Sequence, residues 1–369
     1  MSFWDDLPQP VVGLSPMDGI TDAAFRSITA RHGGPDVTFT EFVPVDRIVR
    51  GDDRSLIGFR YSEHERPVVA QVFGTDPEAF YRVAHVVCTL GFDGIDINMG
   101  CPSKNIAGRG AGAGLIRTPD LARAILRRTR DGISDWASGQ PLDRIGLPPA
   151  VVEAVRHEKG RWHGLREEGI GDSDRKVIPV SVKTRTGYDR DRVEEWILQL
   201  LSESPAAISL HGRTLTQGYS GLADWEAIGR AAEIVRKSPT LLLGNGDIRS
   251  AAMAVQRIRE TGVHGVLLGR VTLGNPWIFG LRERIRSAAR TGILPPPDPS
   301  VPTEEQLSVA LEHAELFDRI RGTRPFRPIR RFLAAYCRGF PGASQLRQRL
   351  IQVDTFADVE SIVRTAACV

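Results

Sequence analysis

The chain has 369 residues, of which 41% are hydrophobic and 25% charged, a composition typical of a soluble folded protein. No run approaches the roughly 18 apolar residues that a membrane-spanning helix needs. The N-terminus, MSFWDDLPQP, carries acids instead of the basic cluster of a signal peptide, so we expect a cytoplasmic location. The formal net charge of +3 is too small to indicate a partner.

The four cysteines, Cys88, Cys101, Cys337 and Cys368, lie far apart in the sequence and form no CxxC pair. This spacing argues against a disulfide framework and against a zinc site. We therefore expect no bound metal, and any functional cysteine should act alone.

Eight short apolar and β-branched runs recur through the first three quarters of the chain, each followed by a helix-like stretch. They begin at Val11, Thr38, Pro67, Gly94, Pro179, Ala207, Leu241 and Gly265. Most lack strict alternation of polar and apolar residues, as expected of parallel strands buried on both faces. Helices are expected between them, because Asp76-Pro77 and Thr118-Pro119 each place a capping residue before a proline.

This repeated pattern predicts an α/β protein with a (β/α)8 TIM barrel over residues 1–291. A doubly wound sheet is the main alternative, but its glycine signature would follow the first strand, where the chain has Pro16-Met17-Asp18-Gly19 instead. A polar insertion at about residues 131–176 interrupts the barrel, with one or two short helices expected around Leu147 to Glu158.

The C-terminal part differs in composition. Five prolines between Gly292 and Pro302 indicate a linker, and a new helix should begin at a capping box formed by Thr303 and Gln306. Residues 303–369 are expected to form a small all-α domain. Nine arginines between Arg319 and Leu350, with no acid among them and with interleaved aromatic residues, favour a nucleic-acid-binding surface, although a solvated helix face is the simpler alternative.

In a barrel of this kind the reactive groups lie at the C-terminal ends of the strands. The ends of the eight runs carry Pro16-Met17, Glu41, Gln71, Asn98 with Cys101, Lys183 with Arg185, His211 with Arg213, Asn245-Gly246-Asp247 and Gly269-Arg270. The last two could bind a phosphate through glycine backbone N–H groups and the Arg270 guanidinium, although GNGD alone could equally be a turn. The glycine-rich segment 108–114 does not satisfy G-x-G-x-x-G, and we expect a flexible loop bordering the site.

Several blocks resemble the signature blocks of the tRNA-dihydrouridine synthases, in order and across the whole barrel. They are PMDGITDAAFR, DINMGCPSKN, VKTRTGYD, HGRTLTQGYSG, LGNGDI and LGRVTLGNPWIF, and IRRFLAAYCRGFPGASQLR resembles the C-terminal helical domain of that family. Asn-Met-Gly-Cys-Pro-Ser is the most specific block. The chain departs from the family pattern at Asp18, at Arg331-Phe332 and in the long insertion, which is either a surface excursion or an element of RNA docking.

The resemblance implies reduction of the C5=C6 bond of specific uridines in tRNA to 5,6-dihydrouridine. In that reaction NADPH reduces bound FMN, a hydride passes to C6 of the uracil, and an acid protonates C5. Cys101 matches the catalytic cysteine of the family. An unperturbed thiol has a pKa of about 8.5, and apolar burial raises it, so the group suits a general acid.

The resemblance also assigns binding roles. The expected FMN-binding residues are Pro16, Met17, Asp18, Gln71, Lys183 and His211, together with Asn245, Gly246, Asp247, Gly269 and Arg270 in the two phosphate loops. Asn98 would hold the uracil edge and Arg185 the base or its phosphate, while Arg330 and Arg331 would bind tRNA. No nicotinamide-binding fingerprint occurs, which fits a reductant that binds transiently, and we expect a monomer.

Two alternatives stay open at this point. An FMN barrel acting on a free small molecule, such as a dihydroorotate dehydrogenase or an ene-reductase, shares the phosphate loops but has no use for a basic helical domain. An RNA-binding protein without flavin is the other, and the presence of Cys101, Lys183 and His211 argues against it.

Overall fold

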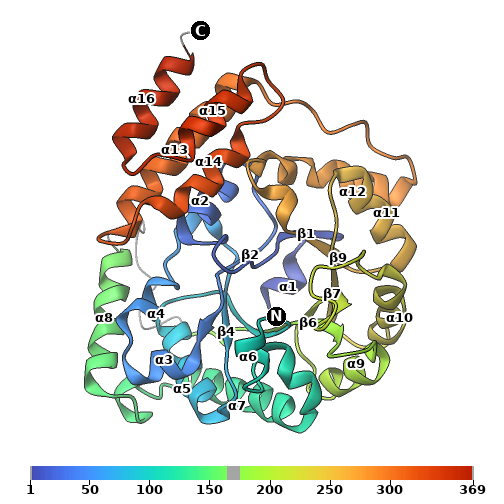
Figure 1. Cartoon of the computed structure of the whole chain (residues 1–369). Coiled ribbons are helices and arrows are strands. Elements are labelled where there is room, and N and C mark those ends of the chain that lie inside the picture. The colour runs from blue at the N-terminus through green and yellow to red at the C-terminus, as the bar shows by residue number, and fades with distance from the viewer. Residues whose placement is uncertain (1, 164–174, 368–369) are drawn as a thin grey trace.

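The computed structural model describes residues 2–163 and 175–367 (Figure 1). Its strands are β1 (Val11–Leu14), β2 (Thr38–Phe39), β3 (Val43–Pro44), β4 (Val68–Phe73), β5 (Gly94–Met99), β6 (Val180–Gly187), β7 (Ala207–Thr214), β8 (Leu241–Asn245) and β9 (Gly265–Leu268). They form one parallel sheet in the order β1-β9-β8-β7-β6-β5-β4-β2, and the short β3 pairs with β4. All eight predicted runs are strands, and β3 is an addition that the sequence did not indicate.

The sheet closes on itself between its first and last members. The N–H of Leu14 in β1 donates to the carbonyl of Val37, and the N–H of Asp36 donates to the carbonyl of Val12, both at 3.0 Å. These two bonds join β1 to the segment that leads into β2. The predicted TIM barrel is confirmed.

Helices follow the strands and surround the barrel. They are α1 (Phe3–Asp6), α2 (Ala23–His32), α3 (Val45–Arg50), α4 (Asp53–Ile57), α5 (Pro77–Thr89), α6 (Lys104–Ala107), α7 (Pro119–Ala137), α8 (Pro149–His163), α9 (Val193–Leu201), α10 (Trp225–Val235), α11 (Ala251–Thr261) and α12 (Arg282–Thr291). Short 3-10 helices are η1 (Glu63–Glu65), η2 (Gly112–Arg117), η3 (Leu142–Arg144), η4 (Arg270–Thr272) and η5 (Pro276–Leu281). As predicted, α5 and α7 both begin with a proline, and the Asp76 side chain caps α5 by accepting from the Glu78 N–H at 3.0 Å. Thr118 occupies the capping position of α7, but its side chain makes no capping hydrogen bond.

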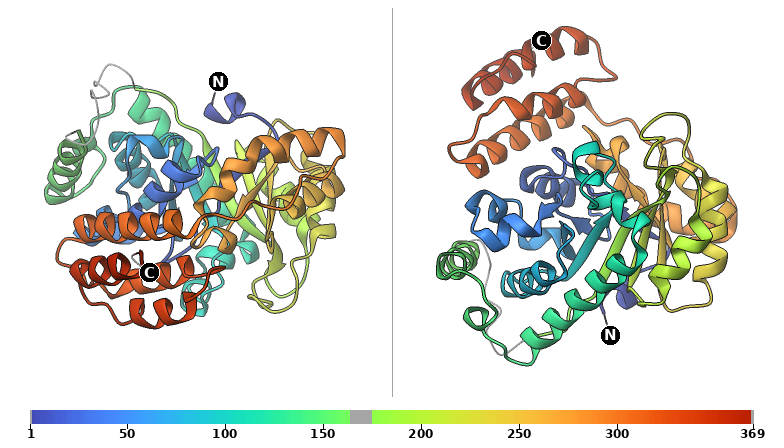
Figure 2. Two further views of the ribbon diagram at one scale, coloured as in Figure 1. Left: turned by 90° about the horizontal axis from the view of Figure 1, so that it is seen from above. Right: turned by 60° about the horizontal axis from the view of Figure 1, so that its bottom comes forward.

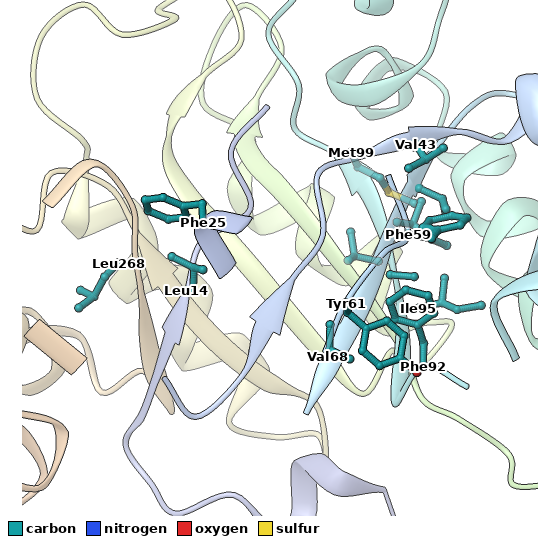
Figure 3. Close-up of a cluster of buried hydrophobic side chains, with 14 of the residues drawn as sticks. Leu14, Phe25, Val43, Phe59, Tyr61, Val68, Phe92, Ile95, Met99 and Leu268 are labelled. Atoms are coloured by element: carbon teal, nitrogen blue, oxygen red, sulfur yellow. The ribbon is translucent and has the colours of Figure 1, made fainter. Parts of the chain in front are cut away.

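The core has two layers. Outside the strands, large side chains fill the space beneath the helices; Figure 3 shows Tyr61 and Phe92 beside β4 and β5, with ring centroids 4.7 Å apart. Inside the barrel a smaller cluster includes Phe39 and Leu267, and Trp4 from α1 packs against it with only 2% of its surface exposed. Burying side chains of this size stabilises the fold by roughly 1.5–3 kcal/mol each. The barrel interior is therefore packed toward the N-terminal ends of the strands. A site can lie only at their C-terminal ends.

The polar insertion is partly helical. Helix α7 extends into the insertion as far as Ala137, and η3 and α8 follow. Helix α8 is longer than the stretch expected around residues 147–158, and it packs on α3, α4 and α5. The remaining residues of the insertion, 164–174, lie outside the described residues.

The C-terminal helices are α13 (Thr303–Arg321), α14 (Arg330–Tyr336), α15 (Ala343–Leu350) and α16 (Phe356–Ala367), with η6 (Arg327–Ile329) before α14. They stack on one side of the barrel against α2, as both views in Figure 2 show. Phe25 of α2 lies 5.4 Å from Phe332 between ring centroids, and Glu312 of α13 pairs with Arg31 at 2.9 Å. The helices α13–α16 are called the helical unit below.

The start of α13 differs from the prediction. Thr303 is the first helical residue, and Pro302 occupies the capping position without a side-chain hydrogen bond. The Gln306 side chain donates to the Val301 carbonyl at 2.8 Å instead of closing a capping box. The predicted capping box is therefore wrong, because the Gln306 amide binds the Val301 carbonyl and Thr303 lies inside the helix. Among residues 2–163 and 175–367, no helix is both long and apolar enough to span a bilayer.

Candidate active site

A cavity of about 760 Å³ opens at the C-terminal ends of the barrel strands. Its lining includes most of the residues that the sequence singled out: Pro16, Met17, Asp18, Asn98, Cys101, Lys183, Arg185, His211, Asn245, Gly246, Asp247, Gly269 and Arg270. These residues come from the ends of β1, β5, β6, β7, β8 and β9. The volume lies within the range of pockets that hold a cofactor-sized ligand.

Cys101 lies two residues beyond the end of β5 and is 8% exposed. Its N–H donates to the Asn98 side-chain oxygen at 2.9 Å, and the preceding carbonyl, of Gly100, accepts from Arg185 Nε at 2.7 Å. Burial raises the pKa of the thiol, with a further contribution from Asp18, and outweighs the opposing effect of the Ser103 N–H, Arg185 and Lys183. The thiol is therefore protonated at neutral pH and can donate a proton.

Asn98 and Gln71 form a chain beneath this turn. The Asn98 oxygen accepts from the N–H groups of Gly100 and Cys101, and its amide NH2 donates to Gln71 Oε1 at 2.9 Å. Gln71 in turn donates to Asp96 at 2.7 Å, and it is fully buried. Gln71 does not line the cavity, unlike the other expected flavin contacts.

Lys183 and His211 lie on neighbouring strands, β6 and β7. Lys183 donates to the Asn245 side-chain oxygen at 3.2 Å, and burial, together with Arg185, lowers the pKa of Lys183 to about 8. Burial and the surrounding cations lower the pKa of His211 to about 2, so its ring is neutral. Because Arg213 Nη1 lies 3.1 Å from His211 Nε2 and can only donate, Nε2 is the acceptor and the ring proton sits on Nδ1.

Arg213 connects three loops of the mouth. It donates to the Gly221 carbonyl at 2.7 Å and to Asp247 at 2.6 Å, and its side chain is 2% exposed. Asp247 also accepts from Arg270 at 2.9 Å and from the Ala223 N–H at 2.8 Å. These contacts lower the pKa of Asp247 and keep it anionic against the opposing effect of burial. The sequence places Arg213 at a strand end but predicts no role for it. Its position beside His211 and Asp247 makes it a residue of the site.

Glycine shapes the loop after β8. Gly246 has a φ of +131°, and an added Cβ would lie 2.6 Å from Ala223 Cβ and 3.1 Å from the His211 ring. Across the cavity, a Cβ on Gly269 would lie 3.4 Å from Met17 Sδ. The first close approach would require displacement of neighbours, so the loop needs glycine at position 246.

Arg185 is almost fully buried and serves two loops. Besides the Gly100 carbonyl it donates to the Thr214 carbonyl at 2.9 Å, and its exposed fraction is 2%. The structure thus gives both expected uracil-binding residues, Asn98 and Arg185, hydrogen bonds that hold the Cys101 turn.

Arg330 and Arg331, adjacent in α14, have different surroundings. Arg330 donates to the Val353 carbonyl at 2.7 Å and to Asp354 at 2.8 Å, with 24% of its side chain exposed. Arg331 is exposed, and it lies against the mouth loop, because a Cβ on Gly19 would be 3.1 Å from Arg331 Nη1. Neither arginine lines the cavity.

The glycine-rich segment 108–114 is largely built into the fold. Gly112 begins η2 with a φ of +57°, and a Cβ there would lie 3.0 Å from Cys101 Cβ. Ala113 and Gly114 are buried. The expected loop bordering the site is in part a 3-10 helix packed behind the cysteine.

Comparison with known proteins identifies the family to which the chain belongs. The family model described as "Dihydrouridine synthase (Dus)" matches residues 13–136 and 173–368. The chain belongs to the dihydrouridine synthase family. Between these two ranges the model leaves residues 137–172 unmatched, and they fall within the polar insertion.

Curated relatives agree with this placement. The chain is 31% identical to a probable tRNA-dihydrouridine synthase 2 of Bacillus subtilis, covering 98% of this chain and 95% of the relative. It is 30% identical to a probable tRNA-dihydrouridine synthase of Staphylococcus aureus strain COL, covering 98% and 94%. Among solved structures it is similar to a DHODH from Eimeria tenella in complex with ferulenol, with a TM-score of 0.48, 12% identity and coverage of 77% and 82%. Similarity at that level does not bear on function.

Proposed function

We propose that this protein is a tRNA-dihydrouridine synthase that reduces the C5=C6 bond of uridines in tRNA, with Cys101 as the general acid. The observation that carries the proposal is the placement of a protonated, hydrogen-bonded cysteine turn in a cavity that Lys183 and His211 also line. A proton donor of this kind must keep its proton at the working pH and face the reacting atom. Cys101 meets the first requirement through burial.

The cavity fits FMN by the chemistry of its lining. At Gly246 the absence of a side chain leaves the backbone open to a ligand. In the neighbouring loop, Arg270 directly follows Gly269 and provides a cation for a phosphate. Lys183 supplies a positive charge near the neutral His211 ring. We infer that these groups, with Asn245, Asp247 and the loop of Pro16, Met17 and Asp18, hold the cofactor. Bound FMN, once reduced by transiently bound NADPH, supplies the hydride.

The protein's own residues do the remaining work. Cys101 holds the proton that is delivered to C5, and Asn98 and Arg185 fix the turn that carries it. The uracil must leave its stack to enter, which costs a few kcal/mol and which the enzyme offsets with contacts to the RNA around it. Lys183 stays protonated at neutral pH and keeps a cation at the cavity wall.

We infer that the helical unit binds the tRNA backbone and forms a second domain, residues 303–369, beside the barrel of residues 1–291. Support comes from its arginines, of which Arg327, Arg331 and Arg349 are exposed. Phosphate contacts of this type dominate the affinity of proteins for RNA and are independent of sequence. Arg331 lies nearest to the mouth and is the best candidate to contact RNA next to the reacting base.

A barrel that acts on a free small molecule is the competing function. It would need the cavity but not the exposed arginines of the helical unit. The two functions differ in substrate, so a direct test distinguishes them.

The test uses purified full-length protein and tRNA transcribed without modifications. The protein should carry FMN, seen in its absorption spectrum, and with NADPH it should form dihydrouridine in tRNA, measured by mass spectrometry. Free uridine and orotate or dihydroorotate serve as alternative substrates. Turnover of a free molecule with untouched tRNA would refute the proposed function, and so would protein that cannot be loaded with FMN.

A further inference from the structure

Asp96 is a buried acid in the middle of β5 that neither the cavity nor any assigned role includes. It is fully buried between its neighbours on β4 and β6. One carboxylate oxygen accepts from Gln71 Nε2 at 2.7 Å, and the other accepts from Ser181 Oγ at 2.7 Å. Burial raises the pKa of Asp96 to about 6, and both hydrogen bonds and nearby Lys183 oppose that rise. A carboxylate in such a position costs several kcal/mol to bury, so an apolar residue would serve mere packing better.

The contacts of Asp96 lead to the catalytic turn in two steps. Gln71 bonds Asp96 with its NH2 group and accepts from Asn98 Nδ2 with its oxygen, at 2.7 and 2.9 Å. The Asn98 oxygen then accepts the N–H groups of Gly100 and Cys101 at 3.0 and 2.9 Å. A continuous chain of side-chain hydrogen bonds therefore joins Asp96 to the backbone of Cys101.

The direction of every bond in this chain is fixed by its two ends. At one end the Cys101 N–H can only donate, so Asn98 must present its oxygen there and its NH2 to Gln71. At the other end a carboxylate can only accept, so Gln71 must present its NH2 to Asp96 and its oxygen to Asn98. Without an acceptor at position 96, the buried NH2 group of Gln71 would lose its partner, and Gln71 would no longer be held in place beneath Asn98. The amide of Asn98 would then lose its anchor below the turn.

We propose that Asp96 is a positioning residue, whose carboxylate orients Gln71 and Asn98 and thereby holds the Cys101 backbone in place for proton transfer. This inference rests on the proposed function for its catalytic consequence, whereas its structural consequence can be measured without turnover. Ser181 satisfies the second oxygen of Asp96 but is not part of the chain.

The first test compares Asp96→Ala with Asp96→Asn. The asparagine oxygen can accept from Gln71 while its NH2 donates to Ser181 Oγ, so the direction of the chain survives without the charge. Asp96→Ala should lower kcat on the order of a hundredfold with little change in KM for tRNA, because a misplaced reacting group costs rate more than binding. Asp96→Asn should recover most of that loss, and Ser181→Ala, the matched control, should stay close to wild type. An Asp96→Asn protein as slow as Asp96→Ala would overturn the proposal, because charge and not direction would then matter.

The second readout is the alkylation rate of Cys101 by iodoacetamide, followed by peptide mass spectrometry. Loosening the turn in Asp96→Ala should raise this rate about fivefold, the effect of losing about one hydrogen bond. Buried Cys88 of α5 reports on global unfolding and should remain unreactive in every variant. An unchanged Cys101 rate in Asp96→Ala would overturn the positioning role. If wild-type protein formed no dihydrouridine, the proposed function would fail while this comparison still tested the chain.

Gln71→Glu covers the case in which Asp96→Ala does not fold. The new carboxyl must keep its proton to donate to Asp96, because two adjacent carboxylates cannot both ionise cheaply. The charged group that acts on Asp96 is Lys183, which in turn is influenced by Arg185 and Cys101. Activity of this variant should fall with rising pH more steeply than in wild type, and a loss that is the same at every pH would count against a directional chain.

Discussion

The barrel mouth and the helical unit use polar side chains in opposite ways. In the mouth, Arg213 and Arg185 are buried and bonded to other parts of the protein, whereas Arg270 at the rim is exposed. Arg213 is 2% exposed and contacts Asp247, and Arg185 is 2% exposed and contacts Gly100. In the helical unit Arg331 and Arg349 are exposed. A preorganised group loses little entropy when it acts, whereas an exposed arginine contributes mainly long-range charge. The mouth should therefore determine the rate of the reaction, and the helical unit the affinity for RNA and its dependence on salt.

After Cys101, the proposed general acid, the largest effect is expected at Lys183. Its pKa of about 8 means that it is charged at neutral pH and loses its charge as pH rises through about 8. The wild-type kcat should accordingly decline above that pH, with the raised pKa of Cys101 adding a decline at higher pH. Lys183→Met should lower kcat on the order of a hundredfold and abolish the break near pH 8, as a pH-rate profile can show. Retention of that break in the variant would assign it to another group.

A smaller effect is expected from the glycine loop. Gly246→Ala places a Cβ 2.6 Å from Ala223 at a φ of +131°, so the loop must shift. We expect FMN affinity to fall about tenfold and the unfolding free energy by roughly 1–3 kcal/mol. Flavin fluorescence titration and thermal unfolding measure the two. Gly280→Ala is the control, since nothing lies within 4 Å of a Cβ there, and equal losses in both variants would show that the loop has no special role.

Arg331→Gln should act on RNA binding alone. Removal of one exposed cation that contacts a phosphate should reduce the slope of log affinity against log salt by about 0.7–0.9 and weaken tRNA binding several-fold at low salt. NADPH oxidation without tRNA should be unchanged. Filter binding over a range of salt concentrations tests this, and a slope identical to that of wild type would remove Arg331 from the RNA-binding surface.

The smallest functional effect is expected at the neighbouring Arg330. Its guanidinium holds the Val353 carbonyl and Asp354, so Arg330→Gln should lower the unfolding free energy by about 1–2 kcal/mol. The salt slope for tRNA should barely change. Denaturant unfolding and the same binding series measure both quantities. A change in slope equal to that of Arg331→Gln would show that the two arginines act alike.

The barrel could be predicted from the sequence because its strands are continuous apolar runs that end in polar or glycine residues. The strand β3 could not, since Val43-Pro44 is too short to form a pattern. Helix α13 begins at Thr303, as predicted, but its capping box does not form. The Thr303 and Gln306 pair fits a capping box in the sequence, and the competing Val301 carbonyl is visible only in three dimensions.

The sequence predicts which residues form the candidate site, but not the hydrogen-bond partners of their side chains. Cys101, Lys183 and His211 meet in the cavity, as the strand ends indicated. Gln71 and Asn98 were expected to point toward ligands, yet both amides have partners within the protein, because neighbouring strands supply Asp96 and the backbone of Cys101. Asp96 begins the DINMGCPSKN block, but it lies inside a strand run, and the sequence alone does not show which side chains it contacts. The separation of Arg330 from Arg331 likewise depends on the rotation between adjacent residues of a helix.

The most direct test of the account is a single-turnover comparison of wild type, Cys101→Ala and Cys88→Ala. Each protein is loaded with FMN, reduced with NADPH in the absence of oxygen and mixed with unmodified tRNA, and flavin reoxidation and dihydrouridine are followed together. The account predicts that wild type and Cys88→Ala react at the same rate, and that Cys101→Ala keeps its FMN and its tRNA affinity but reacts about 10²–10⁴ times more slowly, the usual contribution of a general acid. Dihydrouridine formation by Cys101→Ala at the wild-type rate would contradict it.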